Sequence, residues 1–368
     1  MTDIAMPRLT IGRIVVPATL DAPDAGPFLE MVRIANAVCQ HDAGHDDLRQ
    51  EPTELLGFWQ DQTDWGQTGF WAERDGVILG VVTLRYAQEA GTTTLDFDLM
   101  VDPEHWGEGV EEALLAAAED EAKVLGRTII QTWTLHRPGT PGPKLTPSTG
   151  WGEIPAQDRQ TVFQRANGFS LEQVERNSAF DLRGSFSLVE SMLADAVAVA
   201  GDDYRVVAWT SPPTPDEFQD GYAYAISRMS TDVPQGGMVI EEETWDAERV
   251  RRRDARLAAQ GHMVSVACVQ HVPTGVIAAY NELVITEADR TGATHQYGTL
   301  VLKEHRGRRL GTIVKCANLI RWRDLVPESP RVSTFNAEEN RHMLDINEAI
   351  GFVPVSYAGA WKKVLAEA

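Results

Sequence analysis

The sequence predicts an α/β protein with a mixed β-sheet, and its two halves follow one pattern. Residues 95–126 and 295–326 each begin with an alternating apolar run, pass through a charged turn containing glycine, and continue as a helical run. Each is followed by a short strand and a polar helix that ends in Gly-Phe, at 168–169 and 351–352. Strands that alternate with helices in this way are typical of α/β folds.

The expected order of elements in each half is βααβββαβαββ. Apolar runs with a period of two predict the strands, and runs with helical spacing predict the helices. The halves meet near 183–203, where a helical run predicts a linking helix, so we expect domains at 1–183 and 184–368. The Pro/Gly-rich segment 137–152 has no counterpart in the second half and predicts a loop.

Composition limits the classes of function. The 368 residues include 43% hydrophobic side chains, enough for substantial cores in two or three domains. Acidic residues (54) outnumber Lys and Arg (33), giving a formal charge of −21, which argues against nucleic acid as a partner and favours cationic small molecules such as amines. Three of the ten tryptophans, Trp59, Trp65 and Trp71, either line an acceptor pocket or pack in the core.

The cysteines predict a reducing, cytoplasmic location. Cys39, Cys268 and Cys316 lie far apart and form no disulfide framework. No apolar stretch approaches the length that spans a membrane, so we expect no membrane association. Cys39, His41 and His45 are close in sequence, but the intervening Asp-Ala-Gly-His breaks a helix, and we predict no metal site.

The strongest chemical signal is the segment 301–311, VLKEHRGRRLG. A strand ends, a basic turn follows, and a helix begins near Leu310, so unpaired N–H groups and the positive end of the helix dipole meet at the turn. Gly307 and Gly311 let backbone amides approach a ligand, and three arginines add positive charge. The segment is either an anion cradle, most naturally for a diphosphate, or a solvated basic loop.

The strand–turn–helix element, the order of elements and the Gly-Phe ending resemble the GNAT superfamily of acyl-CoA N-acyltransferases. Its signature is Gln/Arg-x-x-Gly-x-Gly/Ala; Arg306 and Gly311 match the first and last positions, and Arg309 replaces the middle glycine. The arrangement resembles tandem-GNAT proteins of the mycothiol synthase type, especially over 333–352. The resemblance implies two tandem GNAT-like domains, each a twisted mixed sheet flanked by helices, with the C-terminal domain active.

The resemblance also implies the ligands. Acetyl-CoA or another acyl-CoA would be the cosubstrate, and the acyl group would pass to a primary amine of a small molecule by direct attack in a ternary complex. Backbone amides of one run would hold the diphosphate: Arg306, Gly307, Arg308, Arg309, Leu310, Gly311 and Thr312. Leu300, Val301 and Leu302 would pair with the pantetheine arm. Asn336 and Asn340 would line its channel, although Asn336 is equally suited to capping the next helix.

The catalytic groups depart from the family pattern. The tyrosine that protonates the leaving thiolate in many GNAT enzymes is replaced by Asn347, which cannot act as an acid. Tyr357 is either a substitute or a packing residue. Glu282 and His295 are candidate bases for the amine, and the acids of 229–243 suit a substrate loop. The alternative function is a non-catalytic acyl-CoA-binding or scaffold protein.

The two copies of the turn differ in charge. Residues 303–323 carry seven basic residues and one acid, whereas residues 102–127 carry two basic residues and eight acids. The first copy has Trp106 and Glu111 where the signature has Gln/Arg and Gly/Ala. Each nearby acid would repel a diphosphate by roughly 1 to 4 kcal/mol, depending on the effective dielectric. We therefore expect a first domain that keeps the fold but does not bind CoA.

Overall fold

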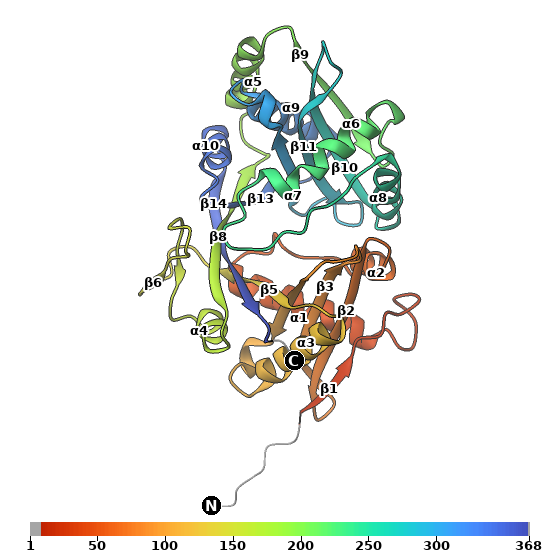
Figure 1. Cartoon of the computed structure of the whole chain (residues 1–368), viewed down its shortest axis with the longest axis vertical. Helices are drawn as coiled ribbons and strands as arrows, with labels where there is room; N and C mark the ends of the chain where they lie inside the picture. Colours follow the sequence, from red (N-terminus) through yellow and green to blue (C-terminus); the bar gives the residue numbers. More distant parts are fainter. Residues whose placement is uncertain (1–8, 367–368) are drawn as a thin grey trace, which may run out of the picture. The chain divides into compact units, whose positions relative to one another are not determined.

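The computed structural model describes residues 9–366, whose α/β fold divides into two compact units (Figure 1). Unit 1 comprises the described chain up to Val174, together with Gly236–Val239 and the chain from Ser356. Unit 2 comprises Glu175–Gln235 and Ile240–Val355. The α/β class is confirmed. The outer ends of the expected domains, 1–8 and 367–368, lie outside the described residues.

Unit 1 is a sheet with helices on both faces. Its elements are β1 (Thr10–Arg13), α1 (Gly26–Ala43), α2 (Pro52–Gln60), β2 (Trp65–Arg74), β3 (Val77–Ala87), β4 (Thr94–Val101), α3 (Val110–Val124), β5 (Ile129–His136), β6 (Lys144–Leu145), β7 (Ile154–Pro155), α4 (Arg159–Ala166) and β8 (Ser170–Asp181). The strand order β1-β2-β3-β4-β5-β14-β8 includes β14 (Val353–Val364) from the end of the chain. Val81 packs with α1 and its neighbour Val82 with α3, because successive side chains of a strand point to opposite faces.

Unit 2 repeats this design. Its elements are α5 (Ser187–Ala200), β9 (Tyr204–Ser211), α6 (Asp216–Ser227), α7 (Met229–Asp232), α8 (Ala247–Ala259), β10 (His262–His271), β11 (Ile277–Thr286), β12 (Thr294–Val301), α9 (Leu310–Leu325), β13 (Arg331–Ala337) and α10 (Arg341–Ile350). The strand order is β8-β13-β12-β11-β10-β9. Cys268 packs with α6 and α8, whereas Val269 packs with α5 and α9, which lie side by side in Figure 1. The helix expected near 183–203 is α5, which packs against α9 within unit 2.

The last strand of each half pairs with strands of the other half. The Glu175–Asp181 part of β8 pairs antiparallel with β13, so it belongs to unit 2. The Tyr357–Val364 part of β14 pairs antiparallel with β5, so it belongs to unit 1. The units therefore differ from the expected domains 1–183 and 184–368. The prediction of two strands after each Gly-Phe was wrong, because β8 and β14 are each one long strand.

Candidate functional site

The turn between β12 and α9 leaves the start of α9 open. Gly307 (φ 83°) and Arg309 (φ 57°) both have left-handed backbone conformations, so Arg309 adopts the conformation that a glycine takes most easily. Arg309 precedes the first residue of α9, and no side chain caps this end of the helix. The first amides of α9 are therefore available to an anion.

The strands before this turn separate as they approach it. Parallel β12 and β13 pair at Thr294–Val332 and His295–Ser333, after which β12 continues to Val301. Between β11 and β12 the register shifts, because both Tyr297 and Gly298 lie opposite Glu282. Such a bulge bends its strand. In unit 1 the pairing of β3 with β4 is regular from Gly80–Val101 to Arg85–Asp96.

A cavity of about 600 Å³ lies beside the turn, within unit 2. Nine of the twelve residues expected to bind the cofactor line it: Leu300, Val301, Arg306, Gly307, Arg309, Leu310, Gly311, Thr312 and Asn340. The other walls come from the segment after α7, through Val233 and Pro234, and from α10, through Met343 and Ile346. A Cβ atom at Gly311 would lie 3.1 Å from Ile346 Cδ1, so a larger residue there requires the Ile346 side chain to shift.

Arg306 and Arg309 line this cavity, and the carboxylate of Asp232 holds two further cations in place beside it. Asp232 accepts hydrogen bonds from Arg228 at 2.7 Å and forms an ion pair with Lys303 at 3.1 Å. Burial raises the pKa of the Asp232 carboxyl, but the hydrogen bonds from Lys303, Arg228 and Thr231 outweigh it and lower the pKa overall. Arg306 donates to the carbonyls of Val301 (3.2 Å) and Asp232 (3.3 Å), which holds its guanidinium at the rim.

Three of the expected cofactor residues do not line the cavity. Leu302 is buried in the core beneath α6 and α8. The Arg308 guanidinium lies over the ring of Tyr204, 5.7 Å from its centroid. Asn336 accepts a hydrogen bond from Asn347 Nδ2 at 2.7 Å, so the two asparagines brace β13 against α10.

Glu282 is a buried, fully engaged carboxylate. It is 4% exposed and accepts hydrogen bonds from Tyr222, from Arg253 Nη2 (2.6 Å) and from the Gly298 amide (3.2 Å). Burial, followed by the negative charge of Glu282, raises the pKa of Tyr222 well above its ordinary value. The expected base is therefore a group that ties β11 to the bulge of β12 and does not line the cavity.

The other two catalytic candidates also lie away from the cavity lining. His295 is half-buried at the start of β12, where that strand still pairs with β13. Tyr357 belongs to unit 1, where its backbone pairs with His136 and its side chain packs against the core around α3. The packing alternative for Tyr357 agrees with this position.

The matching turn of unit 1 is filled by its own side chain. Gly107 (φ 86°) and Gly109 (φ 85°) keep the turn conformation. Glu111, at the position of Gly311, folds back and accepts a hydrogen bond from the Gly107 amide at 2.7 Å. Glu111 is 2% exposed, and burial raises the pKa of its carboxyl. The Glu111 carboxylate thus already accepts the hydrogen bond of an amide that an anionic ligand would need.

Sequence reasoning missed the groups that shape the site. Tyr222 and Arg253 were not singled out, and neither was the bulge, although a glycine inside a strand, such as Gly298, is a known sign of one. Of the candidate metal residues, His45 Nε2 lies 3.0 Å from Ser356 Oγ, and His41 Nδ1 lies 2.7 Å from Asp42 Oδ1. Within residues 9–366 no helix combines the length and apolarity needed to cross a bilayer.

Comparisons with known proteins agree with this geometry. The acetyltransferase (GNAT) family matches residues 32–141, which lie in unit 1. No curated protein matches the chain. Among solved structures, a tandem GNAT protein from the clavulanic acid biosynthesis pathway, solved without AcCoA, has 22% identity, covers 98% of this chain and 100% of its own, and gives a TM-score of 0.73. A GCN5-related N-acetyltransferase from Sphaerobacter thermophilus has 14% identity, covers 99% of this chain and 98% of its own, and gives a TM-score of 0.60.

These likenesses differ in what they cover. The family match lies within one unit and covers part of it. The two structural likenesses extend over nearly the whole chain but, at their low identity, show the fold alone. Residues 32–141 therefore resemble the GNAT acetyltransferase family, and the chain as a whole has the fold of a tandem GNAT protein.

Proposed function

We propose that the protein is an acyl-CoA-dependent N-acyltransferase that binds acetyl-CoA or another acyl-CoA in unit 2. The family match and the tandem GNAT fold support acyl transfer in general. The observation that carries the choice of unit is the pair of turns: the one before α9 is open and borders a cavity, whereas the one before α3 holds Glu111 on its own amide. The 1–183 part would be a domain that keeps the fold without the cofactor.

The residues of the cavity suit the parts of acyl-CoA. The amides at the start of α9 and the Arg306 guanidinium would hold the diphosphate, because both favour negative charge. The diverging ends of β12 and β13 leave the backbone of Leu300 and Val301 for the pantetheine arm. Asn340 lies on the same cavity and would contact that arm.

The chemical step would be direct attack of a neutral amine nitrogen on the thioester carbonyl. A C–N bond forms, the C–S bond breaks, and the amine proton passes to solvent or to a base. Coenzyme A leaves as a thiolate with a pKa near 8.5, so a dedicated acid is not required and the asparagine at position 347 is compatible with transfer. The acceptor would be a primary amine of a small molecule, in the cytoplasm.

Calorimetry with acetyl-CoA, combined with a thiol-release assay over a panel of small amines, tests this proposal. We expect binding, amine-dependent release of CoA, and loss of both in Arg306→Glu, because the variant places a carboxylate at the diphosphate. Arg205→Glu is the matched control, since Arg205 is an exposed arginine of β9 that does not line the cavity.

The outcomes separate the alternatives. Binding without CoA release on any amine would support the non-catalytic acyl-CoA-binding protein instead. Unchanged affinity in Arg306→Glu would refute the assigned cradle, and a complex in which CoA lies in unit 1 would refute the choice of unit.

A further inference from the structure

Helix α9 contains a fully buried lysine, Lys315, to which the proposed acyl transfer gives no role. Its side chain is 0% exposed, and its Nζ atom has no hydrogen-bond partner within residues 9–366. The ring of Phe352 lies beside it, with 5.8 Å between Nζ and the ring centroid. Burial lowers the pKa of Lys315 to about 7. A lysine is rarely buried completely unless it is paired, which indicates that a ligand supplies the partner.

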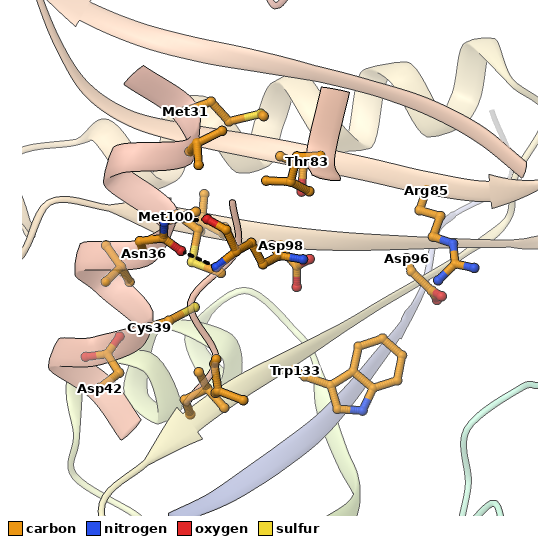
Figure 2. A pocket seen from close by; sticks show the side chains of 18 of the residues that line it. Met31, Asn36, Cys39, Asp42, Thr83, Arg85, Asp96, Asp98, Met100 and Trp133 are labelled. Atoms are coloured by element: carbon orange, nitrogen blue, oxygen red, sulfur yellow. Dashed lines mark hydrogen bonds between the residues drawn. The ribbon is translucent and has the colours of Figure 1, made fainter. Parts of the chain in front are cut away.

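The matching positions of unit 1 are apolar. Leu115 of α3 stands at the position of Lys315, one helical turn after the glutamate that fills the first turn, and it packs in the core. Phe97 of β4 packs in the same core, whereas Asp96 and Asp98 face the other side of that sheet, toward α1 (Figure 2). The fold therefore accepts an apolar side chain here and does not need a lysine.

Lys315 faces the sheet near the point where β12 and β13 separate. It shares one side of α9 with Gly311, Asn318 and Trp322, because residues three and four apart lie on the same side of a helix. Trp322 Nε1 donates to Thr294 Oγ1 of β12 at 2.7 Å, and Asn318 Nδ2 donates to a side chain of β11 at 2.8 Å. Gly311, at the other end of this side, lines the cavity before α9. Lys315 therefore lies between that cavity and the start of β12.

Two further buried polar atoms on the neighbouring elements lack partners in the described part of the chain. Gln296 follows the last residue pair between β12 and β13; its Nε2 donates to Thr334 Oγ1 at 2.9 Å, but its Oε1 is unpaired. Asn347 of α10 is 1% exposed, and its Oδ1 is unpaired. The amide of Phe352, whose ring lies beside Lys315, donates to the Asn347 carbonyl at 2.9 Å. Buried polar atoms are normally satisfied, so these atoms also point to a ligand.

The acyl end of the proposed cosubstrate would arrive at these residues. With the diphosphate at the start of α9, the pantetheine arm would run along β12 from Val301 toward Gln296, and this length of strand spans about 17 Å. Along α9, Lys315 lies about 6 Å beyond Gly311, because a helix rises 1.5 Å per residue. The pantetheine amides and the thioester are uncharged. A buried ammonium near the end of the arm therefore favours an acyl group that carries a negative charge.

We propose that unit 2 selects an acyl-CoA whose short acyl group ends in a carboxylate, such as a malonyl or succinyl group, and that the Lys315 ammonium pairs with this carboxylate. The inference rests on the proposed acyl-CoA site and names the class of its acyl group. An apolar acyl group of the same length leaves the ammonium unpaired, which is the physical basis of the selection. Gln296 Oε1 and Asn347 Oδ1 accept hydrogen bonds from a pantetheine amide or from water that enters with the carboxylate.

Two matched pairs of thioesters test the proposal on the full chain by calorimetry at pH 7.5. Malonyl-CoA is compared with propionyl-CoA, and succinyl-CoA with butyryl-CoA; in each pair a methyl group replaces the carboxylate. We expect the acid of at least one pair to bind at least tenfold more tightly than its neutral partner. If neither acid binds more tightly, although propionyl-CoA and butyryl-CoA bind, the inference is wrong and the acyl-CoA site stands. If no thioester binds, the proposed function fails as well.

Variants assign the selectivity to one side chain. Lys315→Met should weaken the preferred acid at least tenfold and leave its neutral partner within about threefold, and it should fold, because unit 1 has Leu115 at this position. Lys123→Met, which removes an exposed lysine of α3, is the matched control and should change neither affinity. Arg306→Glu should weaken all four thioesters, since it acts on the diphosphate. An acid that keeps its advantage in Lys315→Met would contradict the assignment.

Proton uptake provides a readout on the unmodified chain. With a pKa of about 7, Lys315 is mostly neutral at pH 7.5, and pairing with a carboxylate holds it protonated. The titratable group next to it is Cys316, which burial keeps neutral by raising its pKa to about 12, and Gln296 and Asn347 do not titrate. Calorimetry in HEPES and in Tris should therefore show that the acid takes up roughly half a proton more than its neutral partner. Equal uptake by the two would rule out Lys315 as the partner of the carboxylate.

Discussion

The residue at the second position of the helix after each turn decides whether the turn can take an anion. In α9 this residue is Gly311, and in α3 it is Glu111, whose carboxylate accepts the Gly107 amide. The two turns share their left-handed positions, so backbone shape does not distinguish them. The difference arises from a side chain that supplies the negative charge itself.

Gly311→Glu should therefore abolish acetyl-CoA binding, because it gives the turn before α9 the carboxylate that Glu111 supplies at the turn before α3. The fold should survive with a loss of about 1–3 kcal/mol, because the new side chain crowds Ile346. Gly311→Ala is the control: it adds the same Cβ without charge and should keep affinity within about tenfold. Calorimetry measures the affinities, and thermal unfolding checks the fold; equal losses in the two variants would refute the charge argument.

Lys315 gives a prediction about pH. It is fully buried in α9, its ammonium has no hydrogen-bond partner among the described residues, and burial lowers its pKa to about 7. The unfolded chain has a pKa near 10.4, so it binds more protons than the folded chain between these values. Below about pH 7, folding carries the full cost of burying the charged Lys315 ammonium. Above pH 7 this cost shrinks, so the free energy of unfolding increases with pH.

Lys315→Met should stabilise the protein by a few kcal/mol at pH 6.5, and its advantage over the natural chain should shrink by up to about 1.4 kcal/mol per pH unit above pH 7. Urea unfolding at pH 6.5, 7.5 and 8.5 measures this difference. Lys123→Met, at an exposed position, is the control and should show no such trend. A constant difference across the series would mean that Lys315 is protonated in the folded protein.

Among the elements, β11 and β12 pair on both sides of a bulge, and the buried group of Glu282, Arg253 and Tyr222 lies at that bulge. Glu282 bridges the bulge through the Gly298 amide, so we expect it to act as a positioning residue. Removing one member of a buried ion pair leaves the other charge uncompensated, which is commonly worth about 3–5 kcal/mol.

Glu282→Gln should lower the free energy of unfolding by several kcal/mol, and adding Arg253→Met should restore part of the loss, because no charge is then left buried. A double-mutant cycle by urea unfolding measures this coupling. Acetyl-CoA affinity should fall in Glu282→Gln and recover with the second change, if the bulge sets the course of β12. Additive effects of the two substitutions would indicate that the groups do not interact.

The element pattern could be read from the sequence because it is local. Alternating apolar residues gave the strands, and helical spacing gave α3 and α9, including the turn at Gly307. The bulge and the Glu282–Arg253 pair could not be predicted, because they depend on register between β11 and β12 and on a helix far away in sequence.

For the whole molecule, the sequence repeat suggested two domains that each end with their own strands. Pairing partners are not encoded in a local pattern, so the exchange of β8 and β14 was not foreseen. Cutting the chain at 183/184 would separate β13 from Glu175–Asp181 and β5 from Tyr357–Val364. Each half would then carry an unpaired inner strand edge, which favours aggregation.

We therefore predict that residues 184–368 expressed alone do not fold stably, and that coexpression with residues 1–183 restores a soluble complex. The restored complex should bind acetyl-CoA with the affinity of the intact chain, because no residue of the cavity before α9 lies at the cut. Circular dichroism and size-exclusion chromatography measure folding and association. If residues 184–368 alone gave a cooperative thermal transition, strand exchange would not be what holds unit 2 together.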